Sequence, residues 1–349
     1  MQIHKNVSLA DYTTFGTGGD AQVLITIEQT PELTTALHTH DSPLWFLGSG
    51  ANVLVSDEGL PGTTIRLATS NIEIKETLFV ADAGVNWDDL VQKTIKHQLW
   101  GLESMSGIPG SVGAAVVGNI AAYGQAVSDS LEWVEVIDTN TTTPETICMT
   151  ADELELGYRY SKFQQPKNSH LIITRAAFRL TKKPRPLEYA SALKVADELA
   201  LDPDELESRR KIIMEARRRA GSLISSGADN TKTAGSFFRN PSVTPAQAEL
   251  IMQFEEQSIP LEQIKAQNAV HGGDSTRVSA AHVLLAAGFK RGQSWGPVRL
   301  HPQHILKIEN TGGATSQQIY EVAQEIIQTV ESKLGIKLEP EVRFLGDFN

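Results

Sequence analysis

Cysteine is almost missing from this sequence: Cys148 is the single one in 349 residues. An internal disulfide is therefore excluded, which fits a reducing compartment and predicts a cytoplasmic protein. No second cysteine and no histidine lies near Cys148 at the spacing of metal ligands. We therefore expect neither a structural zinc site nor another metal site.

The sequence also lacks an apolar leader and a basic surplus. Its first 15 residues, MQIHKNVSLADYTTF, contain no apolar run, so we expect neither a signal peptide nor a membrane anchor. The net charge of −11 argues against nonspecific binding of nucleic acid, which needs a basic face. One stretch, RRKIIMEARRRAG (209–221), does gather positive charge. It is either a local site for an anionic small molecule or a solvated helix face, and the sequence leaves both open.

The remaining composition is that of a soluble globular chain of two or three domains, with 40% hydrophobic and 21% charged residues. Short strands and helices are expected along the chain, which becomes more helical after residue 186. Asn86 is the expected N-cap of a helix that begins NWDDLV. Residues 316–334 show a helical apolar stripe that Gly335 ends. The stiff polar stretch KKPRP (182–186) is the expected domain boundary.

Two glycine-rich segments predict close backbone approach to a ligand. LGSGANVLVSD (47–57) follows a strand, and its glycines allow successive N–H groups to hold a phosphate, although a plain hairpin turn fits as well. SGIPGSVGAAVVGNIAAYG (106–124) has too many glycines for a helix and provides a flat surface of small residues. Together the two segments suggest one elongated cofactor with a diphosphate and a ring.

Three further stretches carry candidate chemical groups. In TAGSFFRN (233–240), Ser236 is either a turn serine or a proton donor in a dry pocket. In LGYRYS (156–161), read as a strand, Arg159 points away from Tyr158 and can hold a carboxylate in a fork. In the expected last strand, IKLEPEVRFLG (336–346), Glu341 and Arg343 share one face. That pair is either a surface ion pair or part of a site.

The order of these motifs, with YTTFGTGG, GIPGSVGA, LGYRYSKF, AGSFFRNP, AGFKRGQ and LEPEVRFLG, resembles the UDP-N-acetylenolpyruvoylglucosamine reductase family over about residues 12 to 346. These flavoenzymes complete UDP-N-acetylmuramic acid for the bacterial cell wall. The resemblance implies an α+β protein with an FAD-binding fold of the vanillyl-alcohol-oxidase type in two subdomains, residues 1–67 and 68–182. It also implies a substrate-binding domain, 187–335, and a C-terminal strand, 336–349, that returns to the flavin.

The resemblance further implies that NADPH reduces FAD and that hydride then passes to the enolpyruvyl ether of UDP-N-acetylglucosamine. It gives Ser236 the role of general acid at carbon, Arg159 that of holding the carboxylate, and Glu341 that of polarising it. It also assigns two binding sets. The residues expected to bind the cofactor are Gly48, Ser49, Gly50, Ala51, Asn52, Val53, Gly110, Ser111, Gly113, Asn119, Ile120, Tyr123, Gly124 and Arg343. Those expected to bind the substrate are Tyr158, Tyr189, Asn240 and His304. The expected enzyme is a monomer.

The sequence departs from the family pattern at three positions. Val116 and Gly118 stand where members usually carry proline and glutamine, and Ala220 stands where they usually carry a lysine that contacts the substrate. Arg219 can replace the charge, although arginine and lysine are not interchangeable at a fitted site.

Two alternatives therefore stay open. One is a divergent flavin oxidoreductase of the same fold that acts on another substrate. A flavin attached through histidine near the pyrophosphate loop is disfavoured, because no histidine occurs between His40 and His97. The other is a binding protein without catalysis, which the presence of Ser236, Arg159 and Glu341 makes the weaker alternative.

Overall fold

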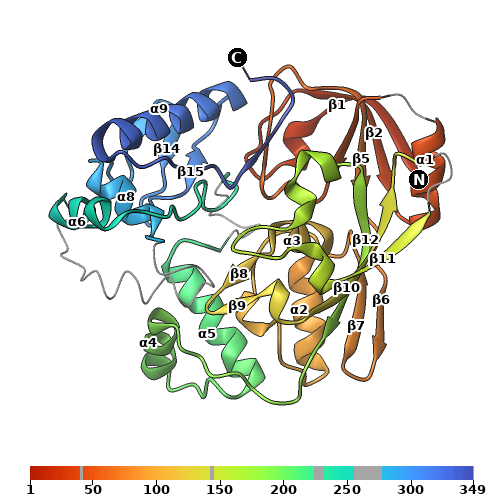
Figure 1. The fold of residues 1–349 in the computed structure, drawn as a ribbon, viewed down its shortest axis with the longest axis horizontal. Coiled ribbons are helices and arrows are strands. Elements are labelled where there is room, and N and C mark those ends of the chain that lie inside the picture. The colour runs from red at the N-terminus through yellow and green to blue at the C-terminus, as the bar shows by residue number, and fades with distance from the viewer. Residues whose placement is uncertain (40–41, 142–144, 224–231, 255–276, 349) are drawn as a thin grey trace. The chain divides into compact units, whose positions relative to one another are not determined.

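A computed structural model describes residues 1–39, 42–141, 145–223, 232–254 and 277–348. These residues form two compact units (Figure 1). Unit 1 comprises residues 1–7, 21–49 and 61–217, and unit 2 comprises residues 8–20, 50–60 and 218–349. Unit 1 continues past the boundary expected at 182–186, and the four segments expected from the sequence stay a prediction. No helix in the described part of the chain is long and apolar enough to cross a membrane.

Unit 1 contains two main sheets and one short hairpin. The four-stranded sheet has the order β1 (Gln2–Ser8), β2 (Asp20–Ile27), β5 (Leu60–Leu67) and β3 (Leu44–Leu47). The five-stranded sheet has the order β11 (Thr146–Thr150), β10 (Leu131–Asp138), β12 (Leu171–Arg179), β7 (Leu78–Asp82) and β6 (Ile72–Lys75). The hairpin joins β8 (Ala121–Ala122) to β9 (Gln125–Ala126).

The five-stranded sheet is apolar on both faces because its central strands have apolar residues at consecutive positions. In the antiparallel pair β10–β12, Val136 faces Ile173 and Ile137 faces Ile172. Successive side chains of a strand point to opposite faces. Val136 and Ile173 accordingly join one apolar cluster, and Ile137 and Ile172 join another that includes β2, β5 and α1 (Thr30–Thr39).

Helices α2 (Trp87–Lys96) and α3 (Val112–Gly118) pack with this sheet into one core (Figure 1). The predicted N-cap of α2 is confirmed: Asn86 Oδ1 accepts hydrogen bonds from the backbone N–H groups of Asp88 and Asp89. The expectation that residues 106–124 contain no helix was wrong at α3. Its seven residues are two glycines, two alanines and three valines, small enough to bring a short helix onto β7 and β12.

The last helices of unit 1 are α4 (Ala190–Leu199) and α5 (Leu206–Arg219). The basic stretch that begins at residue 209 is only partly a solvated face. Lys211, Arg218 and Arg219 are exposed, whereas Arg209 is 1% and Arg217 8% exposed. The Arg209 side chain donates to the carbonyl oxygens of Pro203 (2.6 Å) and Arg185 (3.0 Å). Its guanidinium also lies 5.4 Å from the ring centre of Trp100. This arginine therefore stabilises the loops of unit 1 from inside.

Unit 2 has its own apolar core between helices and short strands. Its helices are α6 (Pro245–Phe254), α8 (Ala280–Ala286) and α9 (Ser316–Leu334). Its strands form two sheets: β13 (Ser294–Trp295), β14 (Val298–Leu300) and β15 (Ile308–Asn310) in one, and β4 (Val53–Val55) with β16 (Arg343–Leu345) in the other. The predicted stripe of α9 is confirmed by burial of Ile319, Val322, Ala323, Ile326 and Val330.

The C-terminal strand is shorter than expected. The sequence predicts one strand over residues 336–346, but regular pairing is limited to β16, which runs parallel to β4. Pro340 forms only an isolated antiparallel bridge with Phe238. Proline has no N–H to donate, so it interrupts a ladder of backbone hydrogen bonds. The segment therefore contacts two different partners. Residues 339–341 pair with the segment around Phe238, and residues 343–345 pair with β4.

Candidate active site

The loop after β3 has the backbone form of an anion cradle. Gly50 has φ +67°, and a Cβ there would lie 1.9 Å from the carbonyl oxygen of Tyr12, so only glycine fits. The Gly50 carbonyl accepts from the N–H of Thr14 (3.1 Å). In the described part of the chain, no hydrogen bond is donated by the backbone N–H groups of residues 49–52. Successive N–H groups of this kind suit a bound phosphate.

The second glycine-rich segment lies against the start of this loop in unit 1. A Cβ on Gly48 would lie 2.7 Å from Ser111 Oγ, and a Cβ on Gly113 would lie 2.9 Å from the Cβ of Ala83. The structure thus brings Gly48 and Ser111 together, as a shared ligand requires. Gly110 (φ +144°) has open space where a Cβ would stand, and its carbonyl accepts from the N–H of Trp87 (3.0 Å).

Tyr158 and Arg159 lie in a tight turn, which corrects the strand predicted there. Gly157 and Tyr160 exchange backbone hydrogen bonds of 3.0 and 3.1 Å, and Arg159 has φ +51°. The reversal places Tyr158 and Arg159 at the tip, where the guanidinium lies 5.9 Å from the Tyr158 ring centre. The two side chains are therefore neighbours rather than on opposite faces.

This turn is fixed to the segment that the sequence assigns to the cofactor. Arg159 Nη2 donates to the carbonyl oxygen of Ala121 (2.8 Å). Asn119 Nδ2 donates to the carbonyl oxygen of Gly157 (2.8 Å), and Asn119 Oδ1 accepts from the N–H of Ser128 (3.0 Å). Asn119 itself has φ +39° and ends α3. It therefore links helix, turn and hairpin in unit 1.

Tyr189 and Tyr123 also meet in unit 1. Their ring centres are 5.0 Å apart and the rings are nearly perpendicular, at 73°, an arrangement that aromatic pairs favour. Burial raises the pKa of Tyr123 to about 12, with the charge of Arg217 opposing the shift. Burial also raises the pKa of Tyr189. Both hydroxyls stay protonated near pH 7 and act as neutral hydrogen-bond groups. Nearby, Ile120 is partly buried and Gly124 has φ +81°.

Ser236 lies between two other segments of unit 2. On one side it pairs with Lys307 in an antiparallel bridge, and the N–H of Phe237 donates to the carbonyl oxygen of Leu306 (2.8 Å). On the other side, the N–H of Glu341 donates to the carbonyl oxygen of Phe237 (2.7 Å). Phe237 and Phe238 are buried, at 0% and 2% exposure. Ser236 itself is half-buried and stands where this apolar wall begins.

Glu341 and Arg343 lie next to the anion cradle in unit 2. Asn52 Nδ2 donates to the carbonyl oxygen of Glu341 (3.1 Å), and the N–H of Arg343 donates to the carbonyl oxygen of Asn52 (3.1 Å). Arg343 pairs with Val53, the first residue of β4. The structure thus brings the residues around Asn52 together with Glu341 and Arg343. Through the bond from Glu341 to Phe237, they also lie near Ser236.

Asn240 and His304 have structural contacts in unit 2. Asn240 Oδ1 accepts from the N–H of Ala280 (2.9 Å), at the start of α8. His304 is half-buried, and burial lowers its pKa to about 4, aided by the charge of Lys307. One residue of this neighbourhood, Lys307, is missing from the sequence-based set. The signal that would reveal it is a lysine inside the apolar run ILKIE (305–309).

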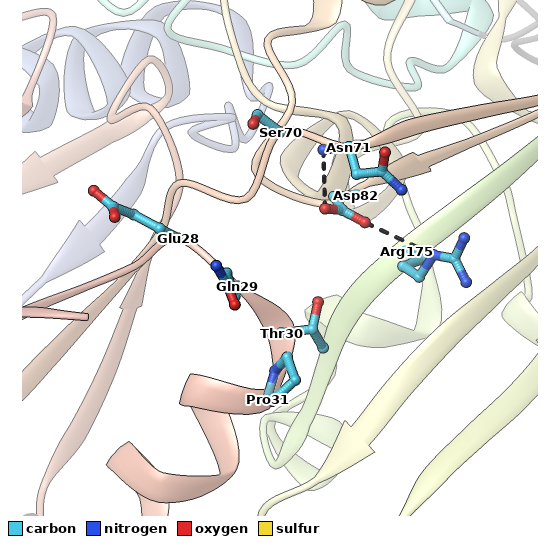
Figure 2. A pocket seen from close by; sticks show the side chains of 8 residues that line it. All are labelled: Glu28, Gln29, Thr30, Pro31, Ser70, Asn71, Asp82 and Arg175. Atoms are coloured by element: carbon cyan, nitrogen blue, oxygen red, sulfur yellow. Dashed lines mark hydrogen bonds and ion pairs between the residues drawn. The ribbon is translucent and has the colours of Figure 1, made fainter.

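A cavity elsewhere in unit 1 contains none of the predicted site residues (Figure 2). Its volume is about 580 Å³. The side chain of Arg175 lies at its edge, 3.7 Å from Asp82. Burial raises the pKa of that carboxyl. The lining residues are Glu28, Gln29, Thr30, Pro31, Ser70, Asn71, Asp82 and Arg175.

Comparisons with known proteins place the chain in a family. The family model for FAD-binding domains matches residues 22–146, and that for the C-terminal domain of UDP-N-acetylenolpyruvoylglucosamine reductase matches residues 227–345. Proteins of this name from Thermobifida fusca and Streptomyces avermitilis are 33% and 32% identical to the chain. The alignments cover 98% and 99% of the chain, and 98% and 95% of those proteins. The chain belongs to the UDP-N-acetylenolpyruvoylglucosamine reductase family.

The fold agrees with this membership. The crystal structure of UDP-N-acetylenolpyruvylglucosamine reductase from Thermus caldophilus has 28% sequence identity and a TM-score of 0.66, covering 99% of this chain and all of that one. The predicted α+β fold with an FAD-binding part of the vanillyl-alcohol-oxidase type is confirmed. The chain is an FAD-dependent oxidoreductase, a reductase of peptidoglycan precursor synthesis.

The residues present fit FAD, as this reductase family requires. The Gly50 cradle and the N–H groups of residues 49–52 suit a diphosphate, and the small residues of 110–118 admit a flat ring close to the backbone. The two segments adjoin at Gly48 and Ser111. The individual cofactor, substrate and catalytic assignments stay predictions.

Proposed function

We propose that the enzyme reduces the enolpyruvyl ether of UDP-N-acetylglucosamine to UDP-N-acetylmuramate, with NADPH as reductant, as a monomer in the cytoplasm. Bound FAD supplies the hydride that adds to the terminal vinyl carbon. What this chain must provide is a hold on the anionic substrate, stabilisation of the charge that develops on it, and one proton delivered to the neighbouring carbon.

Ser236 is the proposed proton donor, and its placement in the structure is the observation that carries the proposal. Gly235 has φ +81° with open space around it, so the chain turns sharply just before the serine. The buried rings of Phe237 and Phe238 follow and limit competing water. Ser236 Oγ–H breaks its bond as the substrate carbon gains the proton, and solvent later restores the hydroxyl. A positioned proton transfer of this kind contributes about 10²- to 10⁴-fold to the rate.

Arg159 and Glu341 are the proposed partners of the substrate carboxylate. In unit 1, the bond from Arg159 to the carbonyl oxygen of Ala121 orients the guanidinium group. It can offset the negative charge that hydride addition leaves in the carboxylate-bearing group. In unit 2, the backbone of Glu341 is held from two directions, by Phe237 and by Asn52. These bonds fix the position of Glu341, and we assign to its carboxyl group the role of polarising the enol-like group.

The remaining assignments concern binding. FAD would be held by the 48–53 loop, the 110–124 segment and Arg343. The UDP-sugar would contact Tyr158, Tyr189, Asn240 and His304. Tyr189 can donate through a hydroxyl that stays protonated, and His304 is a neutral imidazole near pH 7. Neutral donors of this kind orient a polar ligand without adding charge.

The test separates the two half-reactions in an anaerobic cuvette. In the wild-type enzyme, NADPH should bleach the visible flavin bands and UDP-N-acetylglucosamine enolpyruvate should restore them. In Ser236→Ala, we expect bleaching at a near-normal rate, because the serine takes no part in it. Recovery of the bands should slow by about 10²-fold or more, since the proton donor is missing.

Ser294→Ala, at an exposed serine of β13 in the same unit, is the matched control and should recover like the wild type. Equal recovery in Ser236→Ala and in the control would refute the proton-donor role. A wild-type enzyme that bleaches with NADPH but does not recover with the enolpyruvyl sugar would refute the proposed substrate. Rapid reoxidation of the bleached enzyme by air would instead favour an oxidase.

A further inference from the structure

A buried lysine, Lys307, pairs directly with Ser236 in an isolated β-bridge. Lys307 is 2% exposed and lies immediately before β15, across from His301. The N–H of His301 donates to the carbonyl oxygen of Lys307 (2.9 Å), and the N–H of Lys307 donates to the carbonyl oxygen of His304 (2.9 Å). Lysine is among the residues least often buried, so this position calls for a specific role.

Lys307 and Ser236 face one another as an antiparallel pair. The N–H of Phe237 donates to the carbonyl oxygen of Leu306, which joins the residues just beyond the pair. This is the pattern of a non-hydrogen-bonded pair, in which opposing side chains lie closest and on the same face. The amine of Lys307 and the hydroxyl of Ser236 therefore leave the strands in the same direction.

The amine of Lys307 ends beside position 220. Lys307 Nζ donates to the carbonyl oxygen of Gly221, the residue that follows Ala220. Gly221 has φ +60°, and a Cβ there would lie 2.8 Å from His301 Cε1. The chain after Ala220 is thus packed tightly onto His301 and Lys307. The family pattern has a lysine at residue 220. In this chain the Lys307 amine, which comes from a different segment, lies at the neighbouring residue, Gly221.

Lys307 is the cation with the largest effect on both neighbouring histidines, and Arg299 and Arg291 add smaller effects on His301 and His304, respectively. Burial, followed by the charge of Lys307, lowers the pKa values of both His301 and His304, so both rings are neutral near pH 7. Glu309 lies two residues after Lys307, in β15. Its carboxylate forms an ion pair with Arg299, with 2.7 Å between Oε2 and Nε. A positive charge in a site of low dielectric attracts an anion more strongly than the same charge in water.

We infer that Lys307 replaces the lysine missing at position 220 and binds an anionic group of the UDP-sugar substrate beside Ser236. This inference rests on the proposed function and adds a specificity-determining residue to it. The anionic group is either the enolpyruvyl carboxylate or the diphosphate, since an ammonium group recognises both as a point charge.

Three variants test this inference: Lys307→Met, which keeps the side-chain volume without the charge, the double variant Ala220→Lys/Lys307→Met, and the control Lys337→Met at an exposed lysine of the same unit. Lys307→Met should keep FAD and its rate of bleaching by NADPH. Its KM for the enolpyruvyl sugar should rise about 10- to 100-fold, as expected for loss of a charged hydrogen bond. The double variant should recover most of this loss, and the control should not change.

Recovery by a lysine at position 220 distinguishes binding from a structural role, because that lysine does not restore the bond to Gly221. An unchanged KM in Lys307→Met overturns the inference. A raised KM that the double variant does not recover also overturns it, and assigns Lys307 to the backbone of Gly221. A wild-type enzyme that never turns over the enolpyruvyl sugar shows instead that the proposed function has failed.

Binding of UDP, measured by calorimetry, identifies the anionic group. UDP contains the diphosphate but no carboxylate. Weaker binding of UDP by Lys307→Met, with recovery in the double variant, assigns the lysine to the diphosphate. Unchanged binding of UDP together with a raised KM assigns it to the carboxylate.

Discussion

At the scale of single residues, His304 couples the stability of the enzyme to pH. Its pKa is about 4 in the folded chain, against 6.5 for an ordinary histidine. The unfolded chain therefore binds a proton before the folded chain does, and acid favours unfolding. The stabilisation is present above about pH 6.5 and is lost as the pH falls through about 4. At 1.36 kcal/mol per pKa unit, a pKa difference of about 2.5 makes the loss at most about 3 to 4 kcal/mol.

His304→Gln should therefore weaken the dependence of the free energy of unfolding on pH between 7 and 4.5. Urea titrations at several pH values measure this dependence. Part of the slope should remain, because the pKa of His301 is also lowered. His4→Gln, at an exposed histidine of β1, is the control. Equal slopes in His304→Gln and the wild type would contradict the prediction.

Single residues also show what the sequence can predict. Ser236, Arg159 and Glu341 follow from motifs, because their neighbours in the chain are themselves informative. Lys307 does not, since its meaning arises from pairing with Ser236, 71 positions earlier. Arg159 was predicted as a residue, but its conformation was not: φ +51° comes from contacts with residues 117–121 rather than from its own sequence.

At the scale of elements, the regular periods were predicted well. The apolar stripe of α9 follows from a period of 3.6 residues, and the cap of α2 follows from the asparagine that precedes its first turn. The short helix α3 was missed because VGAAVVG has few helix formers. Its helix depends on packing against β7 and β12, which local preference does not contain. The last strand is shorter than predicted because Pro340 has no backbone N–H to donate to a ladder of hydrogen bonds.

Gly335 provides a test at this scale. It ends α9 with φ +63°, and a Cβ there would meet Gln247 Nε2 at 3.8 Å, an ordinary contact. Space is thus no obstacle, and the cost of Gly335→Ala is that of the left-handed backbone alone, about 1 kcal/mol. Thermal unfolding should show a correspondingly lower Tm.

Gly118→Ala is the control for that measurement. Gly118 ends α3 without a positive φ, and a Cβ there would lie 3.5 Å from Ile120 Cγ2. The substitution should be neutral or should stabilise slightly, because it restricts the unfolded chain. If both alanine variants unfold at the same temperature, the end of α9 does not depend on glycine.

At the scale of the whole molecule, the two units contain separate apolar cores. Four of the five tryptophans lie in unit 1, and Trp295 alone lies in unit 2. The fluorescence of Trp295→Phe therefore reports on unit 1, whereas far-UV circular dichroism reports on both units. Chains with several domains commonly depart from two-state unfolding.

We therefore expect the two signals of Trp295→Phe to follow different transitions in urea. Wild-type fluorescence should lie between them, because it includes the unit 2 tryptophan. Superimposable transitions from both probes would show that the units unfold as one cooperative body. The measurement needs the FAD content to be held constant, since a ligand that binds only the folded chain shifts its apparent stability.

The parallel pairing of β16 with β4 has a consequence for synthesis of the protein. Asn52 and Glu341 are hydrogen-bonded although their positions in the chain differ by 289. The loop before β4 therefore gains this contact only after almost the whole chain has been synthesised. A ribosome stalled before residue 345 presents a chain that already contains Ser236 but lacks β16. We therefore expect β4 to gain its strand partner only after translation has passed residue 345.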